Sequence, residues 1–294
     1  RQQSMVWVAI ALLSGVVFGT AVTASRFAFD AGASGILVSI IRTVLVVVVL
    51  AVWVKLAGAR WSLPRGSVKM VILVGILMTA SSYGIIGAVE FISIGFASLL
   101  FFTFPVVIAV IVMGFRIESF NIPKLLAVVL AFVGLIIMME SSIGSVDWRG
   151  TAFAMVASVS TALNAILIAR YCQHMSVLVL MLHTSVITLV VLVLIAAMVG
   201  DVRLPTDAVG WGGIAGVGIL HALGMPMFYS AVGRIGALKA SMAINIQPVT
   251  SIYEAWILFD EVLSFLQAIG GGLVLASIAV MQWMDLRRES DTPE

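Results

Sequence analysis

Residues 87–107, GAVEFISIGFASLLFFTFPVV, return in a related form at residues 230–250, SAVGRIGALKASMAINIQPVT. Matched positions in the two stretches are separated by 143 residues, and the same offset relates a glutamate beyond each stretch. The matched positions are Ala88-Val89 with Ala231-Val232, Ala97-Ser98 with Ala240-Ser241, Pro105 with Pro248, and Glu118 with Glu261. A chain with matches of this kind is built from two related halves.

Weaker matches at nearby offsets extend the repeat over almost the whole chain. Arg42-Thr43 corresponds to His183-Thr184 at an offset of 141 residues. The run from Ser14 to Arg26 corresponds to the run from Ser158 to Arg170 at an offset of 144 residues. We therefore divide the chain into a first half, residues 1–143, and a second half, residues 144–294.

Composition indicates a membrane protein. Hydrophobic residues make up 62% of the chain and charged residues 10%, whereas soluble domains carry about 25% charged residues. The single cysteine, Cys172, cannot form an intrachain disulfide, and no CxxC or HExxH spacing is present. We therefore expect no metal and no cofactor. A net charge of +2 does not suggest a nucleic-acid partner.

Ten apolar segments are each close to the roughly 20 residues that a helix needs to cross a bilayer. The expected segments are 5–25, 35–56, 68–89, 92–114, 121–140, 150–170, 176–199, 209–232, 237–258 and 264–284. Lipid offers no partner for backbone polar groups, and the alternation of a barrel strand is absent from the sequence, so the segments should be helices.

The distribution of Lys and Arg predicts the orientation. With a cytoplasmic N-terminus, twelve of the sixteen basic residues lie on the inside, as the positive-inside rule requires. They are Arg1, Lys55, Arg60, Arg65, Lys69, Arg116, Lys124, Arg170, Arg234, Lys239, Arg287 and Arg288. Both termini are then cytoplasmic. Because each half holds an odd number of segments, the second enters the membrane from the opposite side. We therefore predict ten transmembrane helices as two inverted five-helix repeats around a central cavity.

Inverted halves are typical of a secondary transporter, whose substrate site lies where the halves meet. A channel would need a filter-like run or a ring of acids, which the sequence does not show. An intramembrane hydrolase is the alternative of a different class. It would need a nucleophile with a positioned base, and no GxSxG motif or pair of intramembrane aspartates is present.

The chain resembles the drug/metabolite transporter superfamily, and within it the ten-helix exporters of the EamA type. The resemblance is carried by Arg42, the small residues before Pro105, Pro105, Glu118, Tyr229-Ser230-Ala231, Ala240-Ser241, Pro248, Asp260-Glu261 and Gly270-Gly271-Gly272. The first half departs from the pattern: it has Arg116-Ile117-Glu118 where many members have Gly-Glu, and it lacks the glycine cluster.

Within that family the chain is most similar to bacterial exporters of aromatic and other neutral amino acids. The resemblance implies alternating access across the bacterial inner membrane, with other small metabolites or drugs as the alternative substrates. The expected partners are a small-molecule substrate and the lipid bilayer. We expect a monomer, with a dimer as the alternative. The sequence leaves open whether transport is coupled to protons or facilitative.

Two charged residues lie within apolar segments and are the first candidates for substrate binding. A charge at the bilayer centre costs about 2.5–3.5 kcal/mol, so Arg42 and Glu254 need a partner or a wet cavity. Glu254 shares a helical face with Gln247, Thr250 and Ser251. An amino-acid zwitterion would match one cation and one anion. The alternative is a structural ion pair, or an Arg42 that extends to the outer interface.

Uncharged residues complete the predicted site. Tyr83 and Trp256 are candidates to stack on an aromatic side chain of the substrate or to contact a cation. His183, the repeat counterpart of Arg42, and Asn164 are each either a ligand or a residue satisfied within the core. Pro105 and Pro248 occupy matching places and remove a backbone hydrogen bond, so we predict that they act as hinges.

Overall fold

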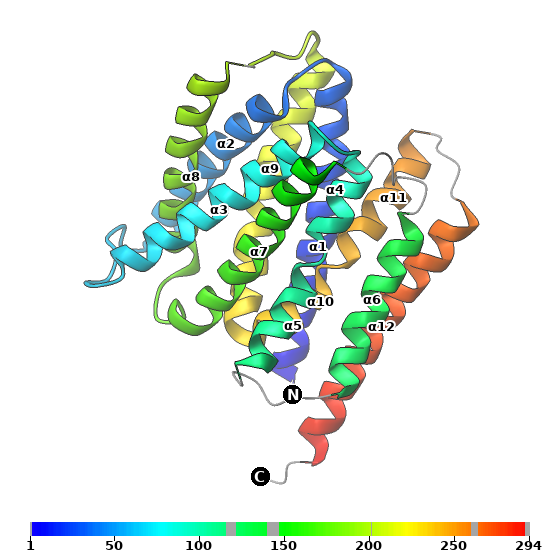
Figure 1. Cartoon of the computed structure of the whole chain (residues 1–294). Coiled ribbons are helices and arrows are strands. Elements are labelled where there is room, and N and C mark those ends of the chain that lie inside the picture. The colour runs from blue at the N-terminus through cyan, green and yellow to red at the C-terminus, as the bar shows by residue number, and fades with distance from the viewer. Residues whose placement is uncertain (1, 116–121, 140–146, 201, 260–263, 292–294) are drawn as a thin grey trace.

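The computed structural model describes residues 2–115, 122–139, 147–200, 202–259 and 264–291, which form a bundle of helices (Figure 1). The repeat markers Glu118, Asp260 and Glu261 lie outside these residues, as do Arg1, Arg116, Ile117 and the predicted boundary after residue 143. The helices are α1 (Gln2–Asp30), α2 (Gly35–Leu56), α3 (Val68–Val89), α4 (Ile94–Phe101), α5 (Phe104–Gly114), α6 (Ile122–Met138), α7 (Trp148–Tyr171), α8 (Val177–Val199), α9 (Ala208–Ile235), α10 (Ala237–Ala243), α11 (Ile246–Leu258) and α12 (Phe265–Asp291).

Two segments that we expected as single helices are divided. The expected helix 92–114 is α4 followed by α5, and the expected helix 237–258 is α10 followed by α11. Each division comes just before one of the matched prolines, Pro105 or Pro248. A proline ring collides with the carbonyl four residues earlier and supplies no N–H, so a helix readily ends there and restarts with proline in its first turn.

Seven stretches of the described residues are long and apolar enough to cross a membrane. They are α1, α2, α3, the α4–α5 pair from residue 96 onward, α7, α8 and α9. α6 and the apolar part of α12 are shorter, and α10 and α11 have 7 and 13 residues. The structure therefore agrees with an all-helical membrane protein but not with ten unbroken spanning helices, because the proline breaks shorten two of them.

Helices of the first half pack against helices of the second half. α9 runs antiparallel to α1, because Gly213 lies against Ala24 and Ala28 while Gly224 lies against Phe18. α7 is antiparallel to α3 in the same way. α2 packs on α8 and α9, and α12 packs on α6 at one edge of the bundle (Figure 1). The start of α1 and the end of α12 lie at the same end of the bundle (Figure 1).

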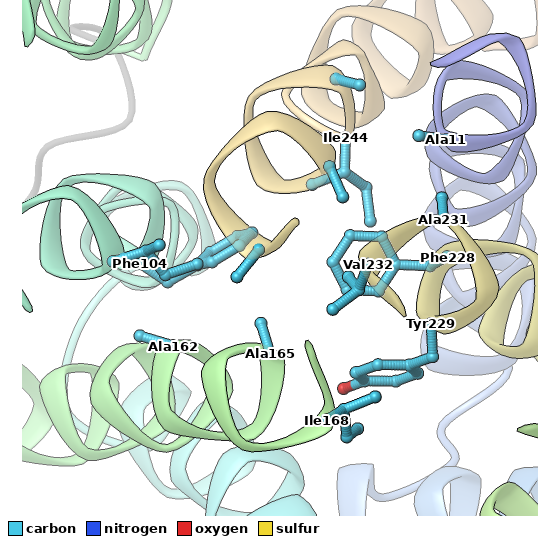
Figure 2. Close-up of a cluster of buried hydrophobic side chains, with 14 of the residues drawn as sticks. Ala11, Phe104, Ala162, Ala165, Ile168, Phe228, Tyr229, Ala231, Val232 and Ile244 are labelled. Atoms are coloured by element: carbon cyan, nitrogen blue, oxygen red, sulfur yellow. The ribbon is translucent and has the colours of Figure 1, made fainter. Parts of the chain in front are cut away.

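An apolar cluster fills the place where α1, α5, α7, α9 and the α10–α11 turn meet. Figure 2 shows Phe104, Ile168, Phe228, Val232 and Ile244 pointing toward one another, and all of them are buried. The residues of α7 and α9 in this cluster lie in the C-terminal part of each helix, whereas Ala11 lies in the N-terminal part of α1. Apolar packing therefore closes the bundle toward the end where α1 begins.

Candidate functional site

Arg42 lies on α2 with its guanidinium directed at α3. Its Nη2 donates a long hydrogen bond of 3.4 Å to Oγ of Ser82. This hydroxyl occupies one of several N–H donors of the guanidinium. Arg42 therefore keeps hydrogen-bonding capacity for an anionic group within a surrounding of apolar helices.

α9 of the second half packs against α2 one turn beyond Arg42. A Cβ atom at Gly218 of α9 would collide with the side chain of Leu45 of α2. His221, about one turn further along α9, packs against the ring of Phe18 on α1, with centroids 4.9 Å apart. The second half of the chain therefore lies next to the helix that carries Arg42.

Glu254 on α11 is held by α1. Oγ1 of Thr20 donates a hydrogen bond of 2.6 Å to Oε1 of Glu254. The other carboxyl oxygen, Oε2, is buried and has no hydrogen-bond partner within the described part of the chain. Gly19 allows this close approach, because a Cβ atom there would lie 2.7 Å from the carbonyl oxygen of Gln247. An unpartnered buried carboxyl oxygen can accept a proton or a cationic group.

Arg42 and Glu254 do not form an ion pair with each other in the part of the chain that the structure describes. Arg42 lies on α2, which packs on α8 and α9, whereas Glu254 lies on α11, which packs on α1. Their hydrogen-bond partners, Ser82 on α3 and Thr20 on α1, also belong to different helices. The two charged residues therefore belong to two separate groups.

Gln247 and Trp256 occupy different sides of α11. The backbone of Gln247 and the side chain of Thr250 lie against Gly19 of α1, on the side that carries Glu254. Trp256 is 46% exposed and packs against Tyr253, with ring centroids 5.7 Å apart. The structure therefore groups Gln247 with Glu254 and leaves Trp256 on an exposed face of α11, where its role in substrate binding stays a prediction.

Tyr83 and Asn164 both lie at the contact between α3 and α7. Tyr83 follows Ser82 and meets the ring of Phe153 edge-on, with centroids 6.1 Å apart. The side-chain amide of Asn164 is satisfied by α3 when its nitrogen faces Val74 and its oxygen faces Met78. In this orientation the nitrogen donates to the carbonyl of Val74 at 3.2 Å, and the oxygen accepts from the N–H of Met78 at 3.1 Å. Tyr83 thus follows the partner of Arg42 in the chain but contacts α7, and the amide of Asn164 is engaged by the backbone of α3.

His183 lies apart from both groups. Its Nδ1 donates a hydrogen bond of 2.8 Å to the carbonyl of Val179, one turn earlier in α8. The imidazole lines a cavity of about 450 Å³ between α2, α3 and α8. The remaining lining residues of this cavity are apolar. A role for His183 in substrate binding stays a prediction.

The two helix breaks are stabilised differently. At the first break, Oγ1 of Thr103 donates to the carbonyl of Leu100 and is paired with Oγ of Ser158 on α7 at 2.7 Å. At the second break, Asn245 is buried, and its Oδ1 has no partner among the described residues. Pro105 and Pro248 follow these turns, in the first turns of α5 and α11. They therefore interrupt no helical hydrogen bond of α5 or α11, and hinging stays a prediction.

Sequence reasoning did not single out Thr20 or Ser82, the hydrogen-bond partners of the two charged residues. Hydroxyl residues are common in membrane helices, where they often bond to their own backbone, as Thr20 also does with the carbonyl of Val16. The available signal was position within an apolar helix: Thr20 lies between Gly19 and Ala21, and Ser82 belongs to the polar run Ser81-Ser82-Tyr83 of α3. Residue type alone could not have distinguished them.

Comparisons with known proteins agree with this fold. The sequence matches the EamA-like transporter family over residues 5–140 and again over residues 148–283. The structure is similar to a solved crystal structure, described only as that of a protein, with a TM-score of 0.82 at 13% identity, covering 95% of this chain and 98% of the other. No protein of curated function matches the sequence.

Because the two family matches cover most of the chain, the protein belongs to the EamA-like transporter family, within the drug/metabolite transporter superfamily, and contains two EamA repeats. It is a multi-pass membrane protein of a family of small-metabolite transporters. The resemblance noted from the sequence is confirmed at this level.

Proposed function

We propose that the protein is a secondary transporter that exports small amphipathic metabolites, with aromatic and other neutral amino acids as the main substrates. One observation carries this proposal: Glu254 of the second half accepts a hydrogen bond from Thr20 of the first half and keeps a buried carboxyl oxygen without a partner among the described residues, where the halves meet. Arg42 lies on α2, which packs on α8 and α9 of the second half. Transporters built from repeats bind their substrates where the repeats meet.

The proposed architecture has ten crossings, arranged as two inverted halves, residues 1–143 and 144–294, around a central cavity. The helix packing supports this architecture. α7 is the repeat counterpart of α1, and α9 is the repeat counterpart of α3. α1 packs on α9 and α7 packs on α3, so each of these helices contacts a helix of the other half in the equivalent way. The start of α1 and the end of α12 lie at the same end of the bundle (Figure 1). This agrees with two termini on one side of the membrane, which we propose is the cytoplasmic side of a bacterial inner membrane. The α4–α5 and α10–α11 pairs would each cross in two pieces.

In this proposal the guanidinium of Arg42 binds the carboxylate of the amino acid, and Tyr83 contacts its side chain. Glu254, through its unpartnered Oε2, receives the ammonium group or a proton. Arg42 and Glu254 lie on helices with different packing partners, so we propose that joint binding involves movement of α1 and α11 relative to α2 during the cycle. The breaks before Pro105 and Pro248 are where such movement would occur.

Uptake into proteoliposomes tests the function. The purified protein should take up labelled neutral and aromatic amino acids, and unlabelled substrate inside should accelerate this uptake by exchange. A pH gradient distinguishes coupled from facilitative transport. If no amino acid of the panel is taken up but other metabolites or drugs are, the proposed substrate class is wrong and those compounds take its place.

An intramembrane hydrolase, the alternative function, has less support among the described residues than a transporter has. Nδ1 of His183 bonds to a carbonyl of its own helix, and the imidazole of His221 packs on Phe18. Neither contact activates a nucleophile. Exchange stimulated by substrate on the opposite side of the membrane is expected of a carrier and not of a hydrolase.

A further inference from the structure

The cavity beside His183 is an apolar pocket next to a basic segment. It has a volume of about 450 Å³ and is formed by α2, α3, α8 and residues 61–63, which connect α2 to α3. Val47 and Ala51 of α2, Ile72 of α3 and Val186 of α8 lie around it. Since its lining is apolar apart from His183, it suits a hydrocarbon group and would leave the charges of a zwitterion without partners.

The segment at the edge of this cavity carries four cations and no acidic residue. They are Lys55, Arg60, Arg65 and Lys69, and all four side chains are exposed. No ion pair involves these four side chains in the described part of the chain. Positive charge is therefore concentrated at one end of the α2–α3 hairpin without neutralisation by the protein.

Basic residues and lining residues are interspersed along this segment. Arg60 directly precedes Trp61, which lines the cavity, and Lys69 directly follows Val68, which also lines it. Trp61 is 49% exposed, as expected for a tryptophan at a membrane interface. A single bound molecule can therefore place an apolar chain in the cavity and an anionic group among the cations.

We propose that this pocket is a binding site for an anionic phospholipid, with an acyl chain in the cavity and the phosphate held by Arg60 and Arg65. Basic residues beside membrane helices attract anionic lipid headgroups, each contributing about 1 kcal/mol. A zwitterionic lipid would satisfy the cavity but not the charge, and a free phosphate would satisfy the charge but not the cavity. The lipid would contact α2 and α3 of the first half and α8 of the second half.

Native mass spectrometry of the purified full-length protein tests this site. The probes are phosphatidylglycerol, phosphatidylcholine with the same acyl chains, and glycerol phosphate. We expect one phosphatidylglycerol to remain bound under conditions that remove phosphatidylcholine, and glycerol phosphate not to compete with it. Equal retention of the two lipids, or displacement by glycerol phosphate, would overturn the proposal.

Two variants separate the headgroup from the chain. The double variant Arg60→Gln/Arg65→Gln should weaken phosphatidylglycerol binding on the order of tenfold or more. Ala51→Phe, which fills the cavity, should weaken it to a similar degree. The matched controls are Arg170→Gln/Arg234→Gln, which removes two exposed cations elsewhere, and Ala215→Phe on the exposed surface of α9.

The basic side chains are exposed, so the double variant should fold even if Ala51→Phe does not, and Ala51→Leu then takes its place. Unchanged binding in the double variant, or equal loss in the control pair, would show that no specific site exists. These outcomes are independent of the transported substrate, because they measure bound lipid and not transport.

Discussion

Thr20 and Glu254 are 234 positions apart in the chain, yet their side-chain oxygens are 2.6 Å apart across the contact between α1 and α11. Thr20 belongs to the first half of the chain and Glu254 to the second. The bond satisfies one carboxyl oxygen, while the other is buried without a partner among the described residues. This contact therefore joins the halves through a group that is only partly satisfied.

Replacing Thr20 with Val should destabilise the protein by about 1–3 kcal/mol, the usual cost of leaving a buried acceptor without its donor. Thr20→Ser retains the hydroxyl and should stay close to wild type. Thermal unfolding of the purified variants in detergent measures the difference. Equal stability of the Val and Ser variants would mean that the hydrogen bond contributes nothing.

Gly270 should be intolerant of larger residues. A Cβ atom at this position would lie 2.5 Å from the carbonyl oxygen of Gly134, so α12 would have to separate from α6. Gly272 is the matched control, because a Cβ atom there meets nothing within 4 Å. Gly270→Val should lower stability by about 1–3 kcal/mol relative to Gly272→Val, with unfolding as the measurement. Identical unfolding of the two variants would contradict the close contact.

Much of the fold could be predicted because apolar segments, breakers and the repeat are local properties of the sequence. The expected segments 35–56 and 68–89 coincide with α2 and α3. The divisions before Pro105 and Pro248 were not expected. A proline in an apolar segment is compatible with either a kink or a break, and the choice depends on packing, such as the pairing of Thr103 with Ser158 across helices.

The candidate site was harder to predict, because it depends on helix rotation and on partners distant in the chain. Arg42 and Glu254 were identified by their charge, and the structure gives each a hydroxyl partner. Their placement in separate groups could not be inferred, since periodicity places a residue on a face without saying which helix lies opposite. The exposure of Trp256 likewise follows from the position of α11.

Labelling with a membrane-impermeant maleimide tests the orientation. Leu204→Cys, in the exposed segment between α8 and α9, should react in intact cells, whereas Ser62→Cys should react only after permeabilisation. The native Cys172 is 3% exposed, and burial raises the pKa of its thiol, so little reactive thiolate forms there. The reverse pattern would place the termini outside.

The double variant Pro105→Ala/Pro248→Ala should transport several-fold more slowly with nearly unchanged substrate affinity. Alanine allows the two divided helices to become continuous, which would stiffen the places where the halves are proposed to bend. Turnover and affinity are compared in proteoliposomes, with Pro64→Ala in the α2–α3 connection as the control. Wild-type turnover in the double variant would exclude hinging at these prolines.

Arg42→Gln and Glu254→Gln should each fold and each lose substrate binding by about 1.5–3 kcal/mol, the scale of a hydrogen bond to a charged group. The loss is expected because glutamine keeps the approximate shape of each side chain but removes the charge that would meet the substrate's carboxylate or ammonium group. Arg170→Gln and Glu90→Gln remove exposed charges of the same kinds and should leave binding unchanged. Binding to the detergent-purified variants is measured directly, with unfolding temperature as the check on folding.

Since the structure shows no ion pair between Arg42 and Glu254 in its described part, reversing both charges should not restore binding. Wild-type affinity in two well-folded single variants would exclude both charges from the site, and restoration by the double reversal would mean that they act as a structural pair.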